Sequence, residues 1–522
     1  MHSTSDDETF GVVEATVGEI HDAIEAGEIT VAWLVDRYLA RIEAYDEDLN
    51  AILTVNEDAH ERARQLDDRF EKEGFTGPLH GIPVVLKDNT DTHDLPTTLG
   101  APGLAEAIPS RDAFVVERLR EAGAVILAKA NLQELSLGVD TISGLGGETQ
   151  NAYALDRRPS GSSGGTAAAV AANLGAIGTG TDTCSSNRSP PAFHSLVGLR
   201  PTRGLISRTG IGPLSETQDT AGPITRTVVD AARMLDVMAG YDPADSVTAK
   251  SAGNLPEDGY LAHLDPNGLD GARIGVVREF FGLHDEDSAS EAVGGQSTPE
   301  AAGEESAPEA AAAEEVTAAV EGALAEMEAA GATIVDPVEI IDRELLDTAR
   351  VIHYEFARDL DQYLADRGEI PYDTLAELVE DGGLGSEIES RITEGGYLDV
   401  DAEALDENTG YLRRLQRRRR IEVDTLARMA DQDLDALAYP PSTIPPVEIP
   451  EKQPFEELNC ELAAHTGLPA LVFPAGFTDD GLPVGIELLG RPFSESQLFE
   501  LAYAYEQETH HRQPPEGFGR LD

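Results

Sequence analysis

The stretch that organises this chain is residues 159–204, PSGSSGGTAAAVAANLGAIGTGTDTCSSNRSPPAFHSLVGLRPTRG. The glycines of residues 161–165 free the backbone for positive φ and for close approach by other groups. Residues 166–174 are rich in alanine and contain neither proline nor glycine, which predicts a helix. A second polar turn at residues 181–186 follows an apolar segment of small residues. One short helix therefore holds two hydroxyl-bearing turns close together.

The composition is strongly acidic, with 38 basic and 97 acidic residues and a formal charge of −59. Nucleic acid and anionic membranes are unfavourable partners because both would be repelled. Only five residues are lysines (Lys72, Lys87, Lys129, Lys250 and Lys452), so arginine supplies nearly all of the positive charge. Together with the acidity, this bias indicates a surface adapted to high salt. A lysine in an apolar segment is then a conspicuous candidate for chemistry.

Cysteine and histidine usage predicts neither a metal site nor a cofactor. Cys184 and Cys460 are the only cysteines and form no CxxC pair, so we expect no zinc knuckle and no disulfide framework, as in a reducing cytoplasm. The 12 histidines lack metal-ligand spacing, and HExxH, Walker A and GxGxxG motifs are absent from the sequence. The opening MHSTSDDETF does not resemble a signal peptide, and no apolar run approaches 18 residues. We therefore expect a soluble, cytoplasmic protein.

The order of elements predicts an α/β protein. Helices are expected near residues 30–42 and 58–72, followed by a short apolar strand at 82–86 that ends at Lys87. A helix and a strand follow within residues 113–130, and residues 273–335 contain a strand, a helix and a strand that make a βαβ unit. Near the end, the segments 470–477 and 482–489 are joined by a turn and predict a hairpin, which a helix at 495–507 follows.

Two segments stand apart in composition. Residues 285–313 are acidic, of low complexity and almost without large apolar side chains, so we expect a disordered insertion. Residues 343–435 are expected to be mostly helical and contain a cluster of arginines, namely Arg413, Arg414, Arg417, Arg418, Arg419 and Arg420. In so acidic a chain, this cluster favours intramolecular pairing with Asp and Glu over binding of nucleic acid.

A hydrolase of the nucleophile-elbow type is not favoured. The pattern Gly-x-Ser-x-Gly at residues 161–165 needs a strand immediately before it, but the preceding NAYALDRRP is polar and ends in proline. Cys184 is a weak candidate for the nucleophile because no histidine accompanies it.

Lys87 offers a different way to activate a serine. Burial that lowers its pKa from about 10.4 to near 7 would let the neutral amine act as a base. If the strand continues by one residue, Asp88 points to the opposite face, so its carboxylate need not keep Lys87 charged. A lysine that is ion-paired at a strand end remains the alternative.

Several motifs together resemble the amidase signature family of serine hydrolases. In chain order they are GPLHGIPVVLKDN, DAFVVERLREAGAVILAKANLQE, GSSGGTAAAVAA, GTDT with the following Ser186, GLRPTRG, SRTGIGPLSETQDTAGPITRTVVDAA and GLPALVFPAGFTDDGLPVGIELLGRPF. The resemblance covers nearly the whole chain except the acidic insertion and the variable helical region. It implies one α/β domain over residues 1–522, with three α/β/α layers and a mixed central sheet. Residues 1–75 would form an N-terminal helical part, and residues 343–435 would shape the substrate pocket.

The resemblance also implies a Ser-cisSer-Lys triad. The family lysine corresponds to Lys87, the bridging serine in a cis peptide to Ser162, and the nucleophile to Ser186. Neutral Lys87 would take a proton through Ser162 while Ser186 attacks an amide carbonyl, and water would later release the acyl group. The backbone N–H groups expected to form the oxyanion hole are those of Thr183, Cys184, Ser185 and Ser186.

The nucleophile loop departs from the family pattern. Cys184 and Ser185 stand where the family usually has two glycines, and Asn187 stands where it has an aliphatic residue. Ser189 and Pro191 are unusual as well. A Cβ at each former glycine position could crowd the acyl pocket or strain the turn, so the loop decides whether this chain turns over its substrate.

Three functions are consistent with these motifs. The leading expectation is a stand-alone amidase, similar to general and peptide-amidase-like members, that hydrolyses a small carboxylic amide to the acid and ammonia or an amine. The first alternative is the glutamine-hydrolysing subunit of a tRNA-dependent amidotransferase, which would need companion subunits. The second is a catalytically impaired amidase-fold protein that binds amides or some partner. The oligomeric state, with a homodimer as one option, and the identity of the amide are left open.

Overall fold

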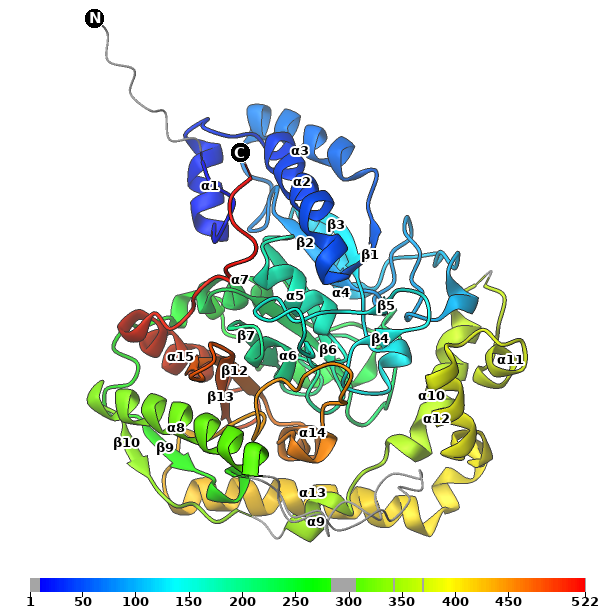
Figure 1. Ribbon diagram of the computed structural model, residues 1–522, viewed down its shortest axis with the longest axis vertical. Coiled ribbons are helices and arrows are strands. Elements are labelled where there is room, and N and C mark those ends of the chain that lie inside the picture. Colours follow the sequence, from blue (N-terminus) through cyan, green and yellow to red (C-terminus); the bar gives the residue numbers. More distant parts are fainter. Residues whose placement is uncertain (1–9, 283–306, 341–342, 369, 522) are drawn as a thin grey trace, which may run out of the picture.

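The computed structural model describes residues 10–282, 307–340, 343–368 and 370–521. One mixed sheet of eleven strands, in the order β1-β3-β2-β6-β8-β7-β12-β13-β11-β9-β10, runs through the molecule with helices packed along it (Figure 1). Its strands are β1 (Ile52–Val55), β2 (Pro83–Lys87), β3 (Val125–Ala130), β6 (Ile177–Asp182), β7 (Val197–Arg200), β8 (Thr220–Thr225), β9 (Arg273–Val276), β10 (Thr333–Val335), β11 (Ala436–Tyr439), β12 (Ala470–Phe477) and β13 (Pro483–Leu489). β4 (Ile142–Ser143) and β5 (Gly147–Glu148) form a separate ribbon. The predicted α/β class with a mixed central sheet is confirmed.

Strand directions explain why the sheet is mixed and where a site can form. β3, β2 and β6 run parallel, as do β11, β9 and β10, whereas β6, β8, β7, β12 and β13 pair antiparallel in that order. The predicted βαβ unit and the hairpin are both present. Because β2 and β6 are parallel neighbours, Lys87 and Asp182 end their strands at the same edge of the sheet. That edge is where open α/β sheets place their ligands.

The helices follow the predicted order with some differences in extent. They are α1 (Val17–Glu25), α2 (Val31–Leu49), α3 (Ala59–Glu73), α4 (Phe114–Glu121), α5 (Gly164–Ala171), α6 (Ser189–Ala192), α7 (Val228–Met238), α8 (Ala307–Ala329), α9 (Arg343–Asp347), α10 (Ile352–Asp366), α11 (Leu375–Glu380), α12 (Ser386–Glu394), α13 (Thr409–Asp431), α14 (Glu461–Thr466) and α15 (Glu495–Thr509). The N-terminal part, expected to be helical, also contributes the edge strand β1.

The acidic insertion predicted over residues 285–313 differs from the expectation in its last part. Residues 285–306 lie outside the described residues, whereas residues 307–313 already belong to the first turns of α8. These residues are mostly alanine, so their helix propensity is high, and they extend a helix whose later turns pack on β12 and β13. In the described ranges, no helix combines the length and the apolar character that crossing a bilayer requires.

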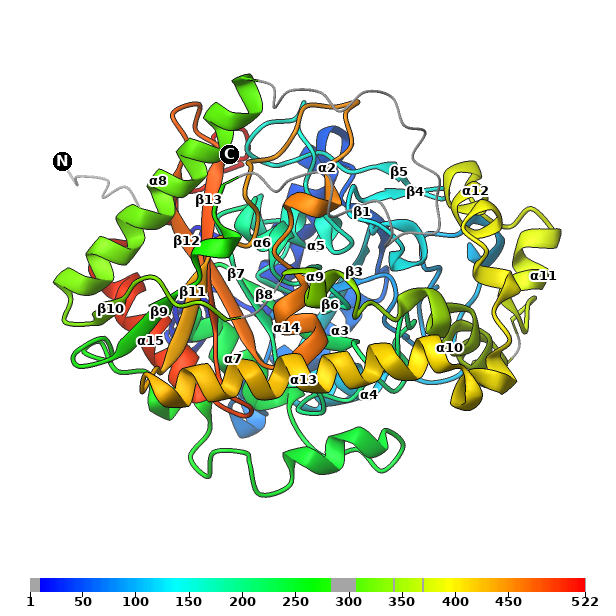
Figure 2. The same cartoon turned by 90° about the horizontal axis from the view of Figure 1, so that it is seen from below.

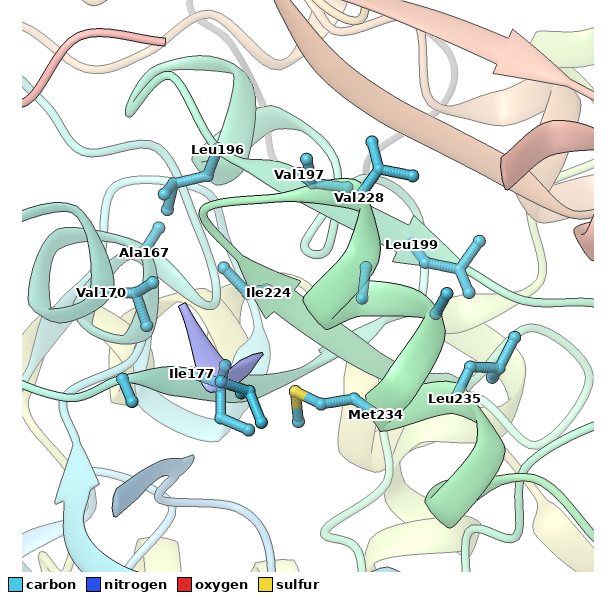
Figure 3. Packing of buried hydrophobic residues seen from close by; sticks show 14 of the residues in the cluster. Ala167, Val170, Ile177, Leu196, Val197, Leu199, Ile224, Val228, Met234 and Leu235 are labelled. Carbon is cyan, nitrogen blue, oxygen red and sulfur yellow. The ribbon is translucent and has the colours of Figure 1, made fainter. Parts of the chain in front are cut away.

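The small residues of the opening stretch fit a crowded interior. Every residue of α5 is buried, and the helix lies against β2 and β6. A Cβ at Gly165 would lie 2.2 Å from the carbonyl oxygen of Asn131, and one at Gly178 would lie 2.5 Å from Thr166 Cγ2. Side chains from α5, from β6, β7 and β8, and from α7 make up this part of the core (Figure 3). Glycine and alanine are therefore required here by close packing as well as by turn geometry.

The helices of residues 343–435 form a separate flank of the molecule. α10, α11 and α12 gather at one side, and α13 runs along the adjoining edge next to α9 and α14 (Figure 2). A second hydrophobic cluster, which includes Phe356, Leu360 and Ile388, packs α10 and α12 onto the loops that follow β2 and β3. This flank thus sits close to the sheet edge at which Lys87 lies.

Candidate active site

A continuous chain of hydrogen bonds joins the lysine and the two serines that the sequence analysis selected. Lys87 Nζ donates to Ser162 Oγ at 2.7 Å, and Ser162 Oγ donates to Ser186 Oγ at 3.1 Å. The backbone N–H of Ser162 also donates to Ser186 Oγ, at 2.9 Å. The peptide bond Gly161–Ser162 is cis, the geometry that the resemblance implies. The structure therefore brings together three residues from β2, the first polar turn and the second polar turn.

Lys87 is fully buried, and its surroundings favour the neutral amine. Burial lowers the pKa of Lys87 to about 7, although the carboxylates of Asp182 and Asp219 act in the opposite direction. Lys87 Nζ also donates to Thr181 Oγ1 at 2.8 Å, and Asn89 Nδ2 donates to the same oxygen at 3.0 Å. The sequence analysis assigned no role to Thr181. Its position in the GTDT motif is the one feature of the sequence that could have pointed to it. At neutral pH a large fraction of Lys87 can accept a proton.

Asp88, the next residue, points away from Lys87. Its Oδ1 lies 3.2 Å from Lys129 Nζ in a fully buried ion pair, and its Oδ2 accepts from the backbone N–H of Thr98 at 3.0 Å. Lys129 Nζ donates in addition to Thr97 Oγ1 at 2.7 Å. The predicted opposite orientation of Asp88 is confirmed, and this carboxylate is neutralised by a different lysine.

Buried ion pairs hold the ends of the loop at residues 183–188, which bears Ser186. Asp182 pairs with Arg200 at 2.6 Å and with Arg188 at 3.1 Å. Arg188 pairs in turn with Glu487 of β13 at 2.6 Å. All four side chains are almost completely excluded from solvent, so each charge depends on its partners. Sequence reasoning did not find this network, because its members come from β6, the loop that bears Ser186, β7 and β13.

The backbone of residues 183–186 can serve as a set of free donors. Within the described residues, no protein acceptor takes a hydrogen bond from the N–H groups of Thr183, Cys184, Ser185 or Ser186. Two carbonyl groups of the loop accept hydrogen bonds: Thr183 O accepts from Gln218 Nε2 at 2.9 Å, and Ser185 O accepts from Arg188 N at 2.8 Å. Neither Cys184 nor Ser185 has a positive φ, so their Cβ atoms impose no left-handed strain on the turn.

The expectation of no disulfide is corrected by the structure. Cys184 and Cys460 form a disulfide bond, with Cα atoms 5.0 Å apart and a sequence separation of 276 residues. Two cysteines so far apart in a long chain give no spacing signal, and only the packing of α14 beside the loop that bears Ser186 brings them together. Cys460 is also the N-cap residue of α14, and its carbonyl accepts from Arg188 Nη2 at 3.2 Å. The loop is therefore tied covalently and by hydrogen bonds to one helix.

Ser186 opens onto a cavity of about 650 Å³. A second cavity, of about 370 Å³, reaches Thr181 and shares Ser136, Thr183 and Leu214 with the first as a common wall. The larger cavity is lined partly by residues of the flank at 343–435, among them Arg350 and His353. Its volume is in the range of small-molecule sites.

The arginine cluster of α13 makes intramolecular contacts, but mostly not the expected ones. Arg418 is buried and donates to Gln218 Oε1 and to backbone carbonyls, and Arg414 and Arg417 both donate to Thr348 O. Arg420 pairs with Asp424 at 3.3 Å, an ion pair of the predicted type. The helix therefore uses its arginines chiefly as donors to main-chain oxygens, and it brings Arg414 to the wall of the larger cavity.

Among the residues that the structure describes, one group outside this site has atoms close enough to hold a metal ion. His93, Asp94 and Asp112 offer ligand atoms that all lie within 4.8 Å of one another. Arg120 already pairs with Asp94 at 2.7 Å and with Asp112 at 3.0 Å, so a guanidinium supplies the positive charge there. The geometry is that of an ion-pair cluster.

Comparison with known proteins gives one consistent result. The family model described as Amidase matches residues 33–297 and 301–499. A glutamyl-tRNA(Gln) amidotransferase subunit of Halorhodospira halophila is 36% identical over 524 residues, which cover 97% of this chain and 99% of that protein. The native peptide amidase from Stenotrophomonas maltophilia has a TM-score of 0.81 at 34% identity, covering 96% of this chain and 98% of that chain. The corresponding glutamyl-tRNA(Gln) amidotransferase subunit from Thermotoga maritima has a TM-score of 0.71 at 25% identity, covering 97% and 98%. Relatives of both kinds align over almost the whole chain.

Proposed function

The chain belongs to the amidase family of hydrolases that act on amide C–N bonds, and from this premise we propose that it hydrolyses a carboxylic amide to the acid and ammonia or an amine. In this proposal Ser186 is the nucleophile, Ser162 relays the proton and Lys87 is the base. The observation that supports it most is the hydrogen-bond chain from Lys87 through Ser162 to Ser186, at the wall of a cavity that can hold a substrate.

The reaction starts with neutral Lys87, whose lowered pKa makes it available as a base at neutral pH. Ser186 Oγ bonds to the amide carbon while its proton passes to Ser162 and the Ser162 proton passes to Lys87. The carbonyl oxygen gains negative charge and is stabilised by the N–H groups of residues 183–186, each worth about 3 to 4 kcal/mol. The C–N bond then breaks, and the leaving nitrogen takes the proton back through Ser162.

Water completes the cycle by the same relay. It attacks the ester carbon of the acyl-enzyme and gives its proton through Ser162 to Lys87. The ester C–O bond then breaks, Ser186 Oγ takes the proton back from Lys87 through Ser162, and the acid is released with Lys87 neutral again. Atoms balance as one amide and one water giving one acid and one amine, so the chemistry consumes no further reactant. Asp88 takes no part, because its charge is paired with Lys129.

The test is release of ammonia from a panel of aliphatic, aromatic and peptide amides in molar salt. The parent is compared with Ser186→Ala and Lys87→Ala, and with Ser390→Ala, a matched control at an exposed serine of α12. We expect turnover in the parent and control and a loss of at least a thousandfold in the two site variants. Turnover that survives in Ser186→Ala would refute the assignment of the nucleophile.

A second candidate is the glutamine-hydrolysing subunit of a tRNA-dependent amidotransferase. The relative from Halorhodospira halophila, with 36% identity over nearly the whole chain, favours it. Gel filtration of natively purified protein, followed by the amide assay, distinguishes the two functions. A monomer or homodimer that hydrolyses simple amides needs no companion subunits, which would exclude the amidotransferase subunit. An absence of turnover on every amide would instead favour a protein that binds amides without hydrolysing them.

A further inference from the structure

The disulfide bond between Cys184 and Cys460 has one of its two residues at the wall of the larger cavity. Cys184 lines this cavity next to Ser185 and Ser186, and it is partly exposed. Cys460 is completely buried. A small molecule that enters the cavity therefore meets the bond from the side of Cys184.

The disulfide is the main restraint on Cys184. In the part of the chain that the structure describes, neither the N–H nor the carbonyl group of Cys184 forms a hydrogen bond with the protein. The preceding residue is held differently, because Thr183 Oγ1 donates to Asp219 Oδ1 at 2.5 Å. The position of the Cys184 N–H group, which faces the site of attack in the proposed function, therefore depends on the bond to Cys460.

The other end of the bond is anchored in the interior of the protein. α14 starts directly after Cys460 and packs against α13. Cys460 O accepts a hydrogen bond from Arg188 Nη2 at 3.2 Å. One turn further along α14, Ala464 O accepts from Nη2 of the buried Arg418 at 2.9 Å. The disulfide thus connects a loop residue that has no hydrogen bond of its own to a helix whose surroundings hold it in place.

From these observations we propose that the Cys184–Cys460 bond is a site of thiol–disulfide exchange, which a small dithiol reaches through the cavity, and that its reduction slows amide hydrolysis. The inference rests on the proposed function, in which Cys184 supplies one of the N–H groups that stabilise the oxyanion. Removing one such donor lowers kcat by about a hundredfold to a thousandfold. Reduction keeps the donor but releases it from its restraint, so we expect a smaller loss of about tenfold, which reoxidation reverses.

The exchange consumes one dithiol and balances in atoms and electrons. A thiolate of the dithiol attacks Cys184 Sγ, the bond between the two cysteines breaks, and Cys460 leaves as a thiolate that takes up a proton. The second thiolate of the reagent then displaces Cys184, which is protonated in turn. Two electrons pass from the dithiol to the protein, and the dithiol becomes a disulfide.

Turnover of the oxidised and the reduced protein tests the effect on hydrolysis. The folded parent is treated with dithiothreitol, freed of the reagent and assayed on the amide that it hydrolyses fastest in the panel, with circular dichroism as the check that it stays folded. We expect kcat to fall about tenfold as two thiols form and to recover when diamide restores the bond. Unchanged turnover in protein with two free thiols would overturn the inference and leave the proposed function standing.

Two variants with a single cysteine form a matched pair that tests access from the cavity. Cys460→Ser leaves the partly exposed Cys184 thiol, and Cys184→Ser leaves the buried Cys460 thiol. In the folded proteins, dithionitrobenzoate should modify Cys184 about a hundredfold faster than Cys460, because a buried thiol reacts only after local opening. Dithiothreitol should change the turnover of neither variant. Equal rates of modification, or a response of either variant to dithiothreitol, would contradict the exchange site.

Mapping the mixed disulfide separates failure of this inference from failure of the proposed function. The folded parent is exposed briefly to mercaptoethanol and then denatured in N-ethylmaleimide, and its peptides are analysed by mass spectrometry. We expect mercaptoethanol on Cys184 and N-ethylmaleimide on Cys460, because the thiolate attacks the accessible sulfur. An adduct on Cys460, or none on either cysteine, would overturn the inference whatever the turnover. The expected adduct in a protein that hydrolyses no amide would support the exchange site and refute the hydrolase.

Discussion

Replacing Lys87 by methionine should abolish turnover and yet stabilise the protein at neutral pH. The side chain is fully buried, and burial lowers its pKa from the usual lysine value of 10.5 to about 7. At a pH between these two pKa values, the unfolded chain binds a proton at Lys87 that the folded chain does not bind. The contribution of Lys87 to the free energy of unfolding therefore rises with pH. The parent therefore suffers a penalty at pH 7 that is largely absent at pH 10.

The size of the effect follows from the two pKa values. With 1.36 kcal/mol per pKa unit, the penalty is about 4 kcal/mol at pH 7 and about 1 kcal/mol at pH 10. Lys87→Met also removes the hydrogen bonds to Ser162 and Thr181, at a cost of about 1 kcal/mol each. The variant should thus be more stable than the parent by about 2 kcal/mol at pH 7 and less stable by about 1 kcal/mol at pH 10.

Thermal unfolding at pH 7 and pH 10 measures this change of sign. For a chain of 522 residues the entropy of unfolding is about 1.1 kcal/mol per kelvin, so the expected differences in Tm are about +2 °C and −1 °C. Subtracting the parent at each pH removes the pH dependence that the rest of the chain contributes. Lys72→Met, at an exposed lysine, is the control and should show no such change. A difference between variant and parent that is the same at both pH values would refute the idea that folding disfavours the charged form of Lys87.

Three further predictions follow from the site. First, kcat/KM of the parent should fall about tenfold for each pH unit below pH 7, because Lys87 becomes protonated. Asp219→Asn should move this fall to lower pH, since the Asp219 carboxylate raises the pKa of Lys87. A pH profile that is unchanged in Asp219→Asn would show that Asp219 does not influence the pKa of Lys87. Second, Cys460→Ser should lower Tm by about 4 °C, because a disulfide bond across 276 residues contributes up to about 5 kcal/mol to stability. Thiol titration of the denatured parent should find no free thiol before reduction, and two free thiols would contradict the Cys184–Cys460 bond. Third, Asp182→Asn should lower the free energy of unfolding by about 3 to 5 kcal/mol, because Arg188 and Arg200 lose the carboxylate that pairs with both of them. An unchanged Tm would show that water neutralises the loss for the two guanidinium groups.

Much of the fold could be predicted because its signals are local. The apolar segment before Lys87 became β2, the alanine-rich segment became α5, and the two apolar runs near the end became β12 and β13. Periodicity and turn residues report on burial within a few neighbouring positions, which is enough to order helices and strands. The prediction was wrong where the composition was ambiguous. Residues 307–313 were included in the segment predicted to be disordered, but their alanines extend α8.

The candidate site was predicted only as a set of residues. Motifs selected Lys87, Ser162 and Ser186, and reasoning about strand faces placed Asp88 away from Lys87, as the ion pair with Lys129 bears out. The contacts of Thr181 with Lys87 and of Arg188 with Glu487 were not foreseen. These contacts depend on which strands become neighbours, and no local pattern encodes that.

The sequence by itself determined the order of elements, the acidic composition of the chain, and the lysine and serines available for chemistry. Only the tertiary structure decided how they meet: Lys87 reaches Ser162 across 75 positions, and Cys184 reaches Cys460 across 276. Burial is likewise a property of the packed chain, so the lowered pKa of Lys87 and the cavity beside Ser186 exist only after the sheet and the helical flank have come together. The physical reason is that local sequence sets backbone preferences, whereas desolvation and charge pairing depend on neighbours that the fold supplies.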